Sequence, residues 1–288
     1  MTHDMWMPSK TVDGPGAVLP VRKDHRERKS MSVKQLLDLS GRVAIVTGGS
    51  RGLGLQMAEA LGEMGAKLAL TSRKQPELDA AVAHLASQGI EARGWVSDAG
   101  KPEQIPGVVD AILAEYGKID VLVNNAGTAW GSPAEDHPLE AWNKLLAVNM
   151  TGAFLMSQEV AKKAMIPAGY GRIIVTASIA GLFAADPRLA KTVAYQASKH
   201  GAIGLTKQLA AEWGRYGITS NAICPGPFPS KLANAMIDAA EDFILAGTPT
   251  GRLGDDQDLK GLVVLLASNA SRHINGQAIA VDGGMSVI

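Results

Sequence analysis

The sequence predicts an α/β fold with a single doubly wound parallel sheet and helices on both faces of that sheet. From residue 41 onward, short apolar strands alternate with amphipathic helices, which is the pattern of such a sheet. The first strand, residues 43–46, is continuously apolar and mostly β-branched, as expected for a strand buried on both faces. A glycine-rich turn, residues 47–54, follows it and leads into a helix from residue 55. Together these observations predict a Rossmann fold over residues 41–288.

The composition is that of an ordinary globular protein. The 288 residues, 46% hydrophobic and 19% charged, suffice for one large α/β domain or two small ones. The net charge of zero favours neither nucleic acid nor membrane as a partner, and no apolar run approaches the ~18 residues of a membrane span. The lone Cys224 excludes an intrachain disulfide, and the six histidines lack metal-ligand spacing. We therefore expect a cytoplasmic protein without a metal site.

The first 40 residues differ from the remainder of the chain. They contain several prolines and glycines, then the charged run 22–29, and they show no hydrophobic region of signal-peptide type. We predict an N-terminal extension over residues 1–40 that is either flexible in solvent or packed on a neighbouring subunit, with a short helix at residues 33–39. Nucleic-acid binding by the charged run is a weaker interpretation, because two acidic residues interrupt its basic residues.

The glycine-rich turn predicts a dinucleotide site. Its glycines allow a tight turn and a close approach of the backbone to a ligand, and the following helix directs free N–H groups and a positive dipole at a phosphate. A strand before the turn and a helix after it favour this site over a plain turn. The residues expected to bind the cofactor here are Gly48, Ser50, Arg51, Gly52, Leu53 and Gly54.

The second strand, residues 67–71, ends where this fold places the adenosine ribose. An Asp or Glu there would bind the 2′-hydroxyl group of NAD, whereas this chain has Ser72 and Arg73. Arg73 and Arg51 place two guanidinium groups where a 2′-phosphate would lie. We therefore favour NADP(H) over NAD(H) as the cofactor. The alternative is that both arginines are solvated surface charges.

The third strand, residues 91–96, follows a helix at residues 76–88 and ends just before Asp98 and Ala99, which we also assign to the cofactor site. Asp98 could accept a hydrogen bond from the adenine amino group, or it could cap the helix that follows Pro102.

The fourth strand, residues 119–123, follows a helix at 103–116 and runs into a short polar motif. Small residues in this motif leave room for a cofactor ribose, so we assign Asn125, Ala126 and Gly127 to the cofactor site. The amides of Asn124 and Asn125 could also tie neighbouring strands together, which makes part of the motif structural.

The helical region 139–165 contains a polar residue, Asn149, within an apolar stretch. A buried amide is costly unless it is hydrogen-bonded, so Asn149 either braces the helix or holds a water near the site. The fifth strand, residues 172–176, delivers Ser178 at its carboxyl end, where open α/β sheets bind their ligands.

The helix at residues 193–216 carries the chemical centre of the chain. Tyr195 and Lys199 are four residues apart, so their side chains share one helix face. A phenol with a pKa near ~10 exchanges protons poorly at neutral pH unless a nearby cation stabilises its phenolate. We expect Lys199 to supply that cation.

The sixth strand, residues 219–223, runs into Cys224, Pro225 and Gly226, and a last strand covers residues 277–281. We assign Pro225 and Gly226 to the cofactor site and interpret Cys224 as core packing. Residues 226–247 would form a lid over the site. Its apolar residues suggest either an inner lid face or plain helix packing; they are Met236, Ile237, Phe243 and Ile244.

These motifs, in this order, resemble the short-chain dehydrogenase/reductase family in its compact-subunit form, from about residue 39 to residue 284. The residues that carry the resemblance are Thr47, Gly48, Gly52, Gly54, Asp98, Asn124 to Gly127, Asn149, Ser178, Tyr195, Lys199, Pro225 and Gly226. Residues 39–44 are similar to gluconate 5-dehydrogenases and 3-oxoacyl-acyl-carrier-protein reductases.

The resemblance implies an NADP(H)-dependent oxidoreductase that interconverts a secondary alcohol and a ketone. Tyr195 would act as acid and base, Ser178 would hydrogen-bond the substrate oxygen, and both Tyr195 and Lys199 would contact the cofactor. Asn149 would position a water that relays protons to Lys199. The substrate could be a 3-oxoacyl compound, a keto-sugar acid or a similar small carbonyl compound.

The resemblance also implies a homo-tetramer or dimer in which helices 139–165 and 193–216 pack across the interface. The competing hypothesis is a catalytically idle dinucleotide-binding sensor or scaffold on the same fold. One departure from the family pattern bears on the substrate. Sixteen residues separate Ser178 from Tyr195, and the excess falls in the loop 183–192, which should border the substrate.

Overall fold

The computed structural model describes residues 30–188, 190–231 and 233–288, and residues 32–288 form one compact unit. Most of the predicted extension, residues 1–29, lies outside the described residues. The short helix α1 (Val33–Leu37) begins at a capping box, in which Ser32 and Gln35 bond each other's backbone N–H groups. The next apolar residue, Leu39, is 1% exposed and belongs to the core of the unit.

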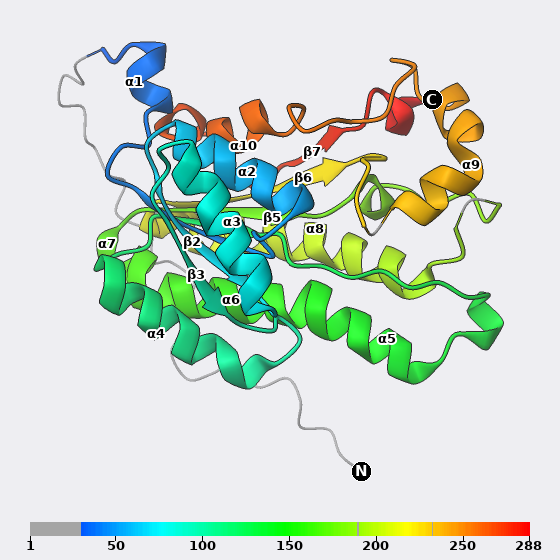
Figure 1. Cartoon of the computed structure of the whole chain (residues 1–288), viewed down its shortest axis with the longest axis horizontal. Coiled ribbons are helices and arrows are strands. Elements are labelled where there is room, and N and C mark those ends of the chain that lie inside the picture. Colours follow the sequence, from blue (N-terminus) through cyan, green and yellow to red (C-terminus); the bar gives the residue numbers. More distant parts are fainter. Residues whose placement is uncertain (1–29, 189, 232) are drawn as a thin grey trace, which may run out of the picture. The chain divides into compact units, whose positions relative to one another are not determined.

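One parallel sheet forms the centre of the unit (Figure 1). Its seven strands lie in the order β3-β2-β1-β4-β5-β6-β7, which confirms the predicted doubly wound sheet. The strands are β1 (Val43–Thr47), β2 (Lys67–Ser72), β3 (Ala92–Val96), β4 (Val121–Asn124), β5 (Gly171–Thr176), β6 (Ile218–Pro225) and β7 (Ala278–Val281).

Helices cover both faces of the sheet (Figure 1). Successive residues of β1 point to opposite sides, so Ala44 and Val46 belong to one apolar cluster and Ile45 to the other. The first cluster packs against α2 (Gly52–Glu63), α3 (Gln75–Ser87) and α10 (Lys260–Ala267). The second packs against α4 (Ile105–Tyr116), α6 (Gly152–Val160) and α8 (Val193–Trp213).

The predicted helix 139–165 is interrupted by two turns of π-helix. It consists of α5 (Leu139–Leu146), the π turn η3 (Ala147–Thr151), α6, a second π turn η4 (Ala161–Met165) and α7 (Ile166–Ala168). A π turn holds one more residue than an α turn and often occurs at functional sites. The first π turn carries Asn149.

The sheet order fixes where a ligand can bind. The chain leaves β1 in one direction toward β2 and β3, then returns through α4 to place β4 on the other side of β1. Loops that leave the carboxyl ends of β1 and β4 therefore diverge and leave a crevice between them.

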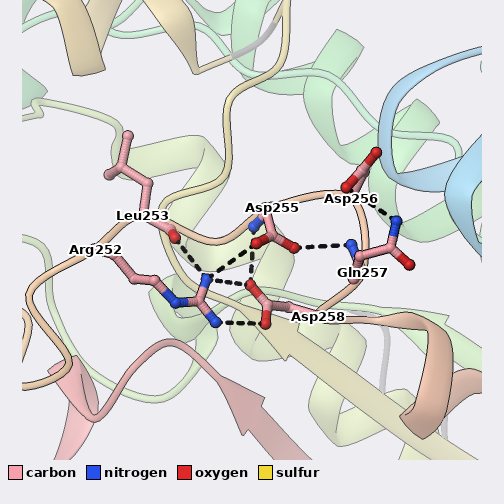
Figure 2. Close-up of polar contacts among 6 residues, drawn as sticks. All are labelled: Arg252, Leu253, Asp255, Asp256, Gln257 and Asp258. Atoms are coloured by element: carbon pink, nitrogen blue, oxygen red, sulfur yellow. Dashed lines mark hydrogen bonds and ion pairs between the residues drawn. The ribbon is translucent and has the colours of Figure 1, made fainter.

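A polar network shapes the loop between α9 (Asn234–Ala246) and α10. Figure 2 shows Arg252 held by both oxygens of Asp258, at 2.6 and 2.7 Å, and by the carbonyl of Leu253 at 3.0 Å. This pairing lowers the pKa of Asp258 to about 2. Gly254 then bonds the carbonyl of Pro227 at 3.0 Å, so the loop is tied to the start of the predicted lid. Among the described residues, no helix is long and apolar enough to cross a membrane.

Candidate active site

A single cavity of about 1150 Å³ lies at the carboxyl ends of the strands. Of the predicted site residues, all but Asn149 line it. They come from the glycine-rich turn, the ends of β2 to β6 and the first turns of α8, and the structure therefore brings the two predicted groups, catalytic and cofactor-binding, into one cavity.

The glycine-rich turn forms a close-fitting backbone cradle. Gly48 has φ of +64°, and a Cβ atom on it would lie 3.1 Å from Cα of Ala126. A Cβ atom on Gly54 would collide with the Gly48 carbonyl, so only glycine lets α2 approach the turn this closely. No side chain caps the N-terminus of α2, which leaves its first N–H groups free for an anion. This cradle fits the pyrophosphate of a dinucleotide.

Hydrogen bonds join the motif after β4 to the glycine-rich turn and hold this backbone cradle in shape. The Thr47 hydroxyl accepts hydrogen bonds from the backbone N–H groups of Asn125 and Ala126, at 2.9 and 3.0 Å. Asn125 in turn donates to the carbonyl groups of Thr47 and Gly48, at 3.0 and 3.3 Å. Asn124 donates to Ser157 on α6 at 2.8 Å. The expectation that these amides tie neighbouring strands together is confirmed for Asn125, which bonds the end of β1, whereas Asn124 ties β4 to α6 and not to a strand.

Three cations and Glu77 line the adenosine end of the cavity near the ends of β1 and β2. Arg51 and Lys74 both pair with Glu77 on α3, at 3.1 and 3.4 Å. Arg73 is exposed and makes no ion pair within the part of the chain that the structure describes. Ser50 and Ser72 bond each other at 3.1 Å between the two segments. Sequence reasoning missed Lys74 and Glu77, although both follow Arg73 within four residues.

Asp98 shapes a turn rather than a helix cap. Its carboxylate accepts a hydrogen bond from the Gly100 N–H group at 2.9 Å, and its own N–H group donates to Gln104 at 2.9 Å. The short helix η1 (Pro102–Gln104) begins after Lys101 without a side-chain cap. The alternative that Asp98 caps this helix is therefore wrong, and Asp98 lines the cavity instead.

Ser178, Tyr195 and Lys199 meet at the end of β5. The Ser178 hydroxyl accepts a hydrogen bond from the Ala180 N–H group at 3.1 Å, so its proton can be donated elsewhere. Lys199 Nζ lies 5.5 Å from the centre of the Tyr195 ring and donates to the Thr176 carbonyl at 2.7 Å. The three side chains thus surround the point where β5 ends and α8 begins.

Burial is the main cause of the pKa shifts of Lys199 and Tyr195. Lys199 is 6% exposed, and burial lowers its pKa to about 8. Burial also raises the pKa of Tyr195, which contact with Ser178 partly offsets. The net direction for Tyr195 is opposite to the one expected from its spacing with Lys199, because burial of the phenol is the larger effect. Tyr195 is therefore a protonated phenol at neutral pH.

The side chain of Asn149 joins the loop after β4 to α8 through hydrogen bonds. Its amide nitrogen donates to the Thr128 carbonyl and to the Ser198 hydroxyl, both at 2.9 Å. Its oxygen accepts from the Thr128 N–H group at 2.9 Å. Of the two roles predicted for this side chain, these bonds account for bracing, and the water relay stays a prediction.

Two parts of the site were not recognised from the sequence. Gln196, next to Tyr195, faces the backbone of the loop after Ser178: with its amide nitrogen turned toward the carbonyls of Ala180 and Phe183 it donates to both, and its oxygen accepts from the Ala185 N–H group. Large apolar side chains also line the cavity beyond Tyr195, among them Trp130 and Phe183. The unusual length of the loop 183–192 is the only sequence signal for either.

The predicted lid corresponds to the helix α9 with its preceding turn. Some of its apolar residues line the cavity, and others pack in the protein interior. Met236 and Phe243 line the cavity, while Ile237 is 5% exposed and packs inside the protein. Ile244 is 1% exposed and contributes to the cavity wall. Non-helical backbone at Ala240 bends α9 near its middle.

Comparison with known proteins gives matches along the whole unit. A family model described as enoyl-(acyl carrier protein) reductase matches residues 48–286. A gluconate 5-dehydrogenase of Gluconobacter oxydans strain 621H is 37% identical over 259 residues, 89% of this chain and 99% of the relative. A 3-oxoacyl-[acyl-carrier-protein] reductase of Escherichia coli K12 is 34% identical over 252 residues, 88% of this chain and 100% of the relative.

A solved structure extends the likeness to three dimensions. The gluconate 5-dehydrogenase from Burkholderia cenocepacia J2315, in complex with NADP and tartrate, has a TM-score of 0.84 at 35% identity. The match covers 89% of this chain and all of that chain, 100%. The range matched by the family model, residues 48–286, includes the glycines of the turn from Gly48 onward and the residues around Tyr195.

Proposed function

The chain belongs to the short-chain dehydrogenase/reductase family of oxidoreductases, and from this premise we propose that it interconverts a secondary alcohol and a ketone with NADP(H). One observation carries the proposal. The cavity that contains the pyrophosphate cradle also contains Ser178, Tyr195 and Lys199, so a cofactor and a proton donor can act on one substrate.

The preference for NADP(H) rests on the cations at the adenosine end. Arg73 is exposed at the cavity wall and Arg51 lies across from it on the glycine-rich turn. Guanidinium groups bind phosphate through paired, charge-assisted hydrogen bonds, which a 2′-hydroxyl group cannot match. The related structure solved with NADP supports the same choice.

The proton chemistry follows from the geometry around Tyr195. When bound, the nicotinamide would supply the hydride exchange. Tyr195, protonated at neutral pH, would donate its proton to the carbonyl oxygen during reduction, and Ser178 would stabilise negative charge on that oxygen with its hydroxyl proton. In oxidation Tyr195 would accept the proton. Lys199 would hold the cofactor ribose and, as a buried ammonium, favour the phenolate.

The substrate is a small carbonyl compound or alcohol, of the 3-oxoacyl, keto-sugar acid or related classes. The assembly we propose is a homo-tetramer or dimer. Exposed apolar residues on the helices assigned to the interface support it: Leu139 on α5 is 72% exposed and Phe154 on α6 is 38% exposed. The cytoplasmic location stays a prediction.

The test is a comparison of the wild type with Tyr195→Phe. NADPH binding is measured by fluorescence titration, and turnover by the change in NADPH absorbance over a panel of ketones, β-ketoacyl thioesters and keto-sugar acids. Tyr195→Phe should lower kcat by at least about a hundredfold and leave the Kd for NADPH unchanged. Tight NADPH binding by the wild type without turnover of any panel member would instead favour an idle sensor.

A further inference from the structure

Three aromatic side chains from separate segments form the walls of the cavity beyond the catalytic residues. Trp130, on the loop after β4, is 44% exposed; Phe183, on the loop after Ser178, is 37% exposed; and Phe243, on α9, is 45% exposed. Side chains of this size are usually buried, so their exposure inside a cavity marks a surface that a ligand can cover.

The loop 183–192, which carries Phe183, contacts the segments that carry the other two aromatic walls. Ser132, two residues after Trp130, pairs with Thr192 at the far end of this loop. Gly131 lies so close to it that a Cβ atom there would be 2.7 Å from the Lys191 carbonyl. The guanidinium group of Arg188 lies 5.0 Å from the centre of the Phe243 ring, so the same loop also contacts the lid.

The walls are held in place before any substrate arrives. Gln196 bonds the backbone on both sides of Phe183, through the carbonyls of Ala180 and Phe183 and the N–H group of Ala185. Arg188 is in turn fixed by Asp186, both of whose oxygens accept from its Nε at 3.0 Å. These contacts order the loop that carries Phe183, so the wall can receive a ligand without first losing conformational freedom.

The charged residues that line the cavity near the three aromatic walls do not suit an anionic substrate. Asp186 lines the cavity as a carboxylate, and Arg188 is occupied in neutralising it. The lining lysines outside the adenosine end, Lys144, Lys191 and Lys231, are all exposed, and exposed lysines gain little from pairing with a carboxylate. Lys199 is the buried cation of the cavity, but its ammonium bonds Thr176 beside the catalytic residues.

We infer that the substrate is a neutral ketone or secondary alcohol that bears a bulky apolar ring, and not a sugar acid. The inference rests on the proposed function and names the substrate class for it. The ring would lie between Trp130, Phe183 and Phe243, with its carbonyl oxygen toward Ser178 and Tyr195. An apolar ring would bury its whole surface against these aromatic faces, whereas each hydroxyl group of a polyhydroxylated acid that lies against them must give up a hydrogen bond to water.

The first experiment compares two probe substrates with the full chain and NADPH: 4-tert-butylcyclohexanone and 5-keto-D-gluconate. We expect kcat/KM for the cyclohexanone to exceed that for the keto acid by about tenfold or more. A higher value for the keto acid would overturn the inference. The affinity of each probe for the NADPH complex is measured in parallel by nicotinamide fluorescence. If neither probe is reduced, the binding measurement decides the nature of the pocket, and tighter binding of the keto acid overturns the inference; the proposed function is then judged separately, by turnover over the whole substrate panel.

Variants test separately whether the aromatic walls or the lysines select the substrate. Phe243→Ala should lower kcat/KM for the cyclohexanone by about tenfold without changing the Kd for NADPH, whereas Phe243→Tyr, which keeps the ring, should stay within about twofold of the wild type. Lys231→Gln removes a charge from the cavity lining and should lower kcat/KM for the cyclohexanone by less than about threefold, a smaller loss than in Phe243→Ala. A large loss in Lys231→Gln together with none in Phe243→Ala would show that charge, and not the aromatic wall, selects the substrate.

Discussion

Replacing Lys199 by methionine should stabilise the folded protein at neutral pH while removing its activity. Lys199 is 6% exposed, and burial lowers its pKa from 10.5 to about 8. At about 1.4 kcal/mol per pKa unit, the buried ammonium costs about 3 kcal/mol of folding free energy. Methionine removes that charge but leaves the Thr176 carbonyl without its donor, a loss of about 1 kcal/mol. The free energy of unfolding should therefore rise by about 2 kcal/mol.

The pH dependence of this effect has a fixed sign. Below about pH 8 Lys199 is charged in both states and the cost is fully present. Between about 8 and 10.5 the unfolded chain keeps a proton that the folded chain has lost, so the wild type gains stability as the pH rises. Lys199→Met cannot titrate at this position. Its advantage over the wild type should therefore shrink through this interval.

Urea unfolding followed by tryptophan fluorescence, at neutral pH and at about pH 10, measures both effects. The matched control is Lys207→Met, on the exposed side of the same helix, which should change the free energy of unfolding by less than about 0.5 kcal/mol. A Lys199→Met protein less stable than the wild type at neutral pH, or a difference that does not vary with pH, would refute the reasoning.

Three further predictions concern the cofactor and the catalytic loop. Arg73→Asp should weaken NADPH binding at least about tenfold more than NADH binding in a fluorescence titration, and an equal loss for both would contradict the 2′-phosphate assignment. Glu77→Gln releases Arg51 and Lys74 from their ion pairs, so the same titration should show NADPH binding about threefold tighter, with NADH as the control. Gln196→Leu frees the loop after Ser178 and should lower kcat/KM about tenfold at unchanged NADPH affinity. The exposed Gln208→Leu on the same helix is its control, and a similar loss there would point to a general effect on α8.

The strands could be predicted from sequence because their signals are local. Buried parallel strands are continuous apolar runs, and the predicted ranges 67–71 and 172–176 differ from β2 and β5 by one residue each. The helix at 139–165 was predicted in extent but not in form. Its two π turns shift the register of the apolar face by a fraction of a turn, which a search for 3.6-residue periodicity does not detect.

The site could be predicted where a rule of the fold applies. Residues at the carboxyl ends of parallel strands meet at one edge, so Ser178 and the glycine-rich turn could be placed together before any coordinates were known. The clamp made by Gln196 and the aromatic walls depend on loops that are distant in sequence, and no local pattern encodes those contacts. The pKa of Tyr195 shows the same limit, because the four-residue spacing does not reveal how deeply the phenol is buried.

The order of the strands also separates, along the sequence, the residues at the adenosine end of the cavity from those at its substrate end. The residues placed here at the adenosine end all lie between positions 47 and 99, and those placed at the substrate end all follow Asn124. The segment between them, α4, packs on the opposite side of the sheet from α2 and α3. A recombination within α4 would therefore exchange the coenzyme preference of two relatives and leave their substrate ranges in place.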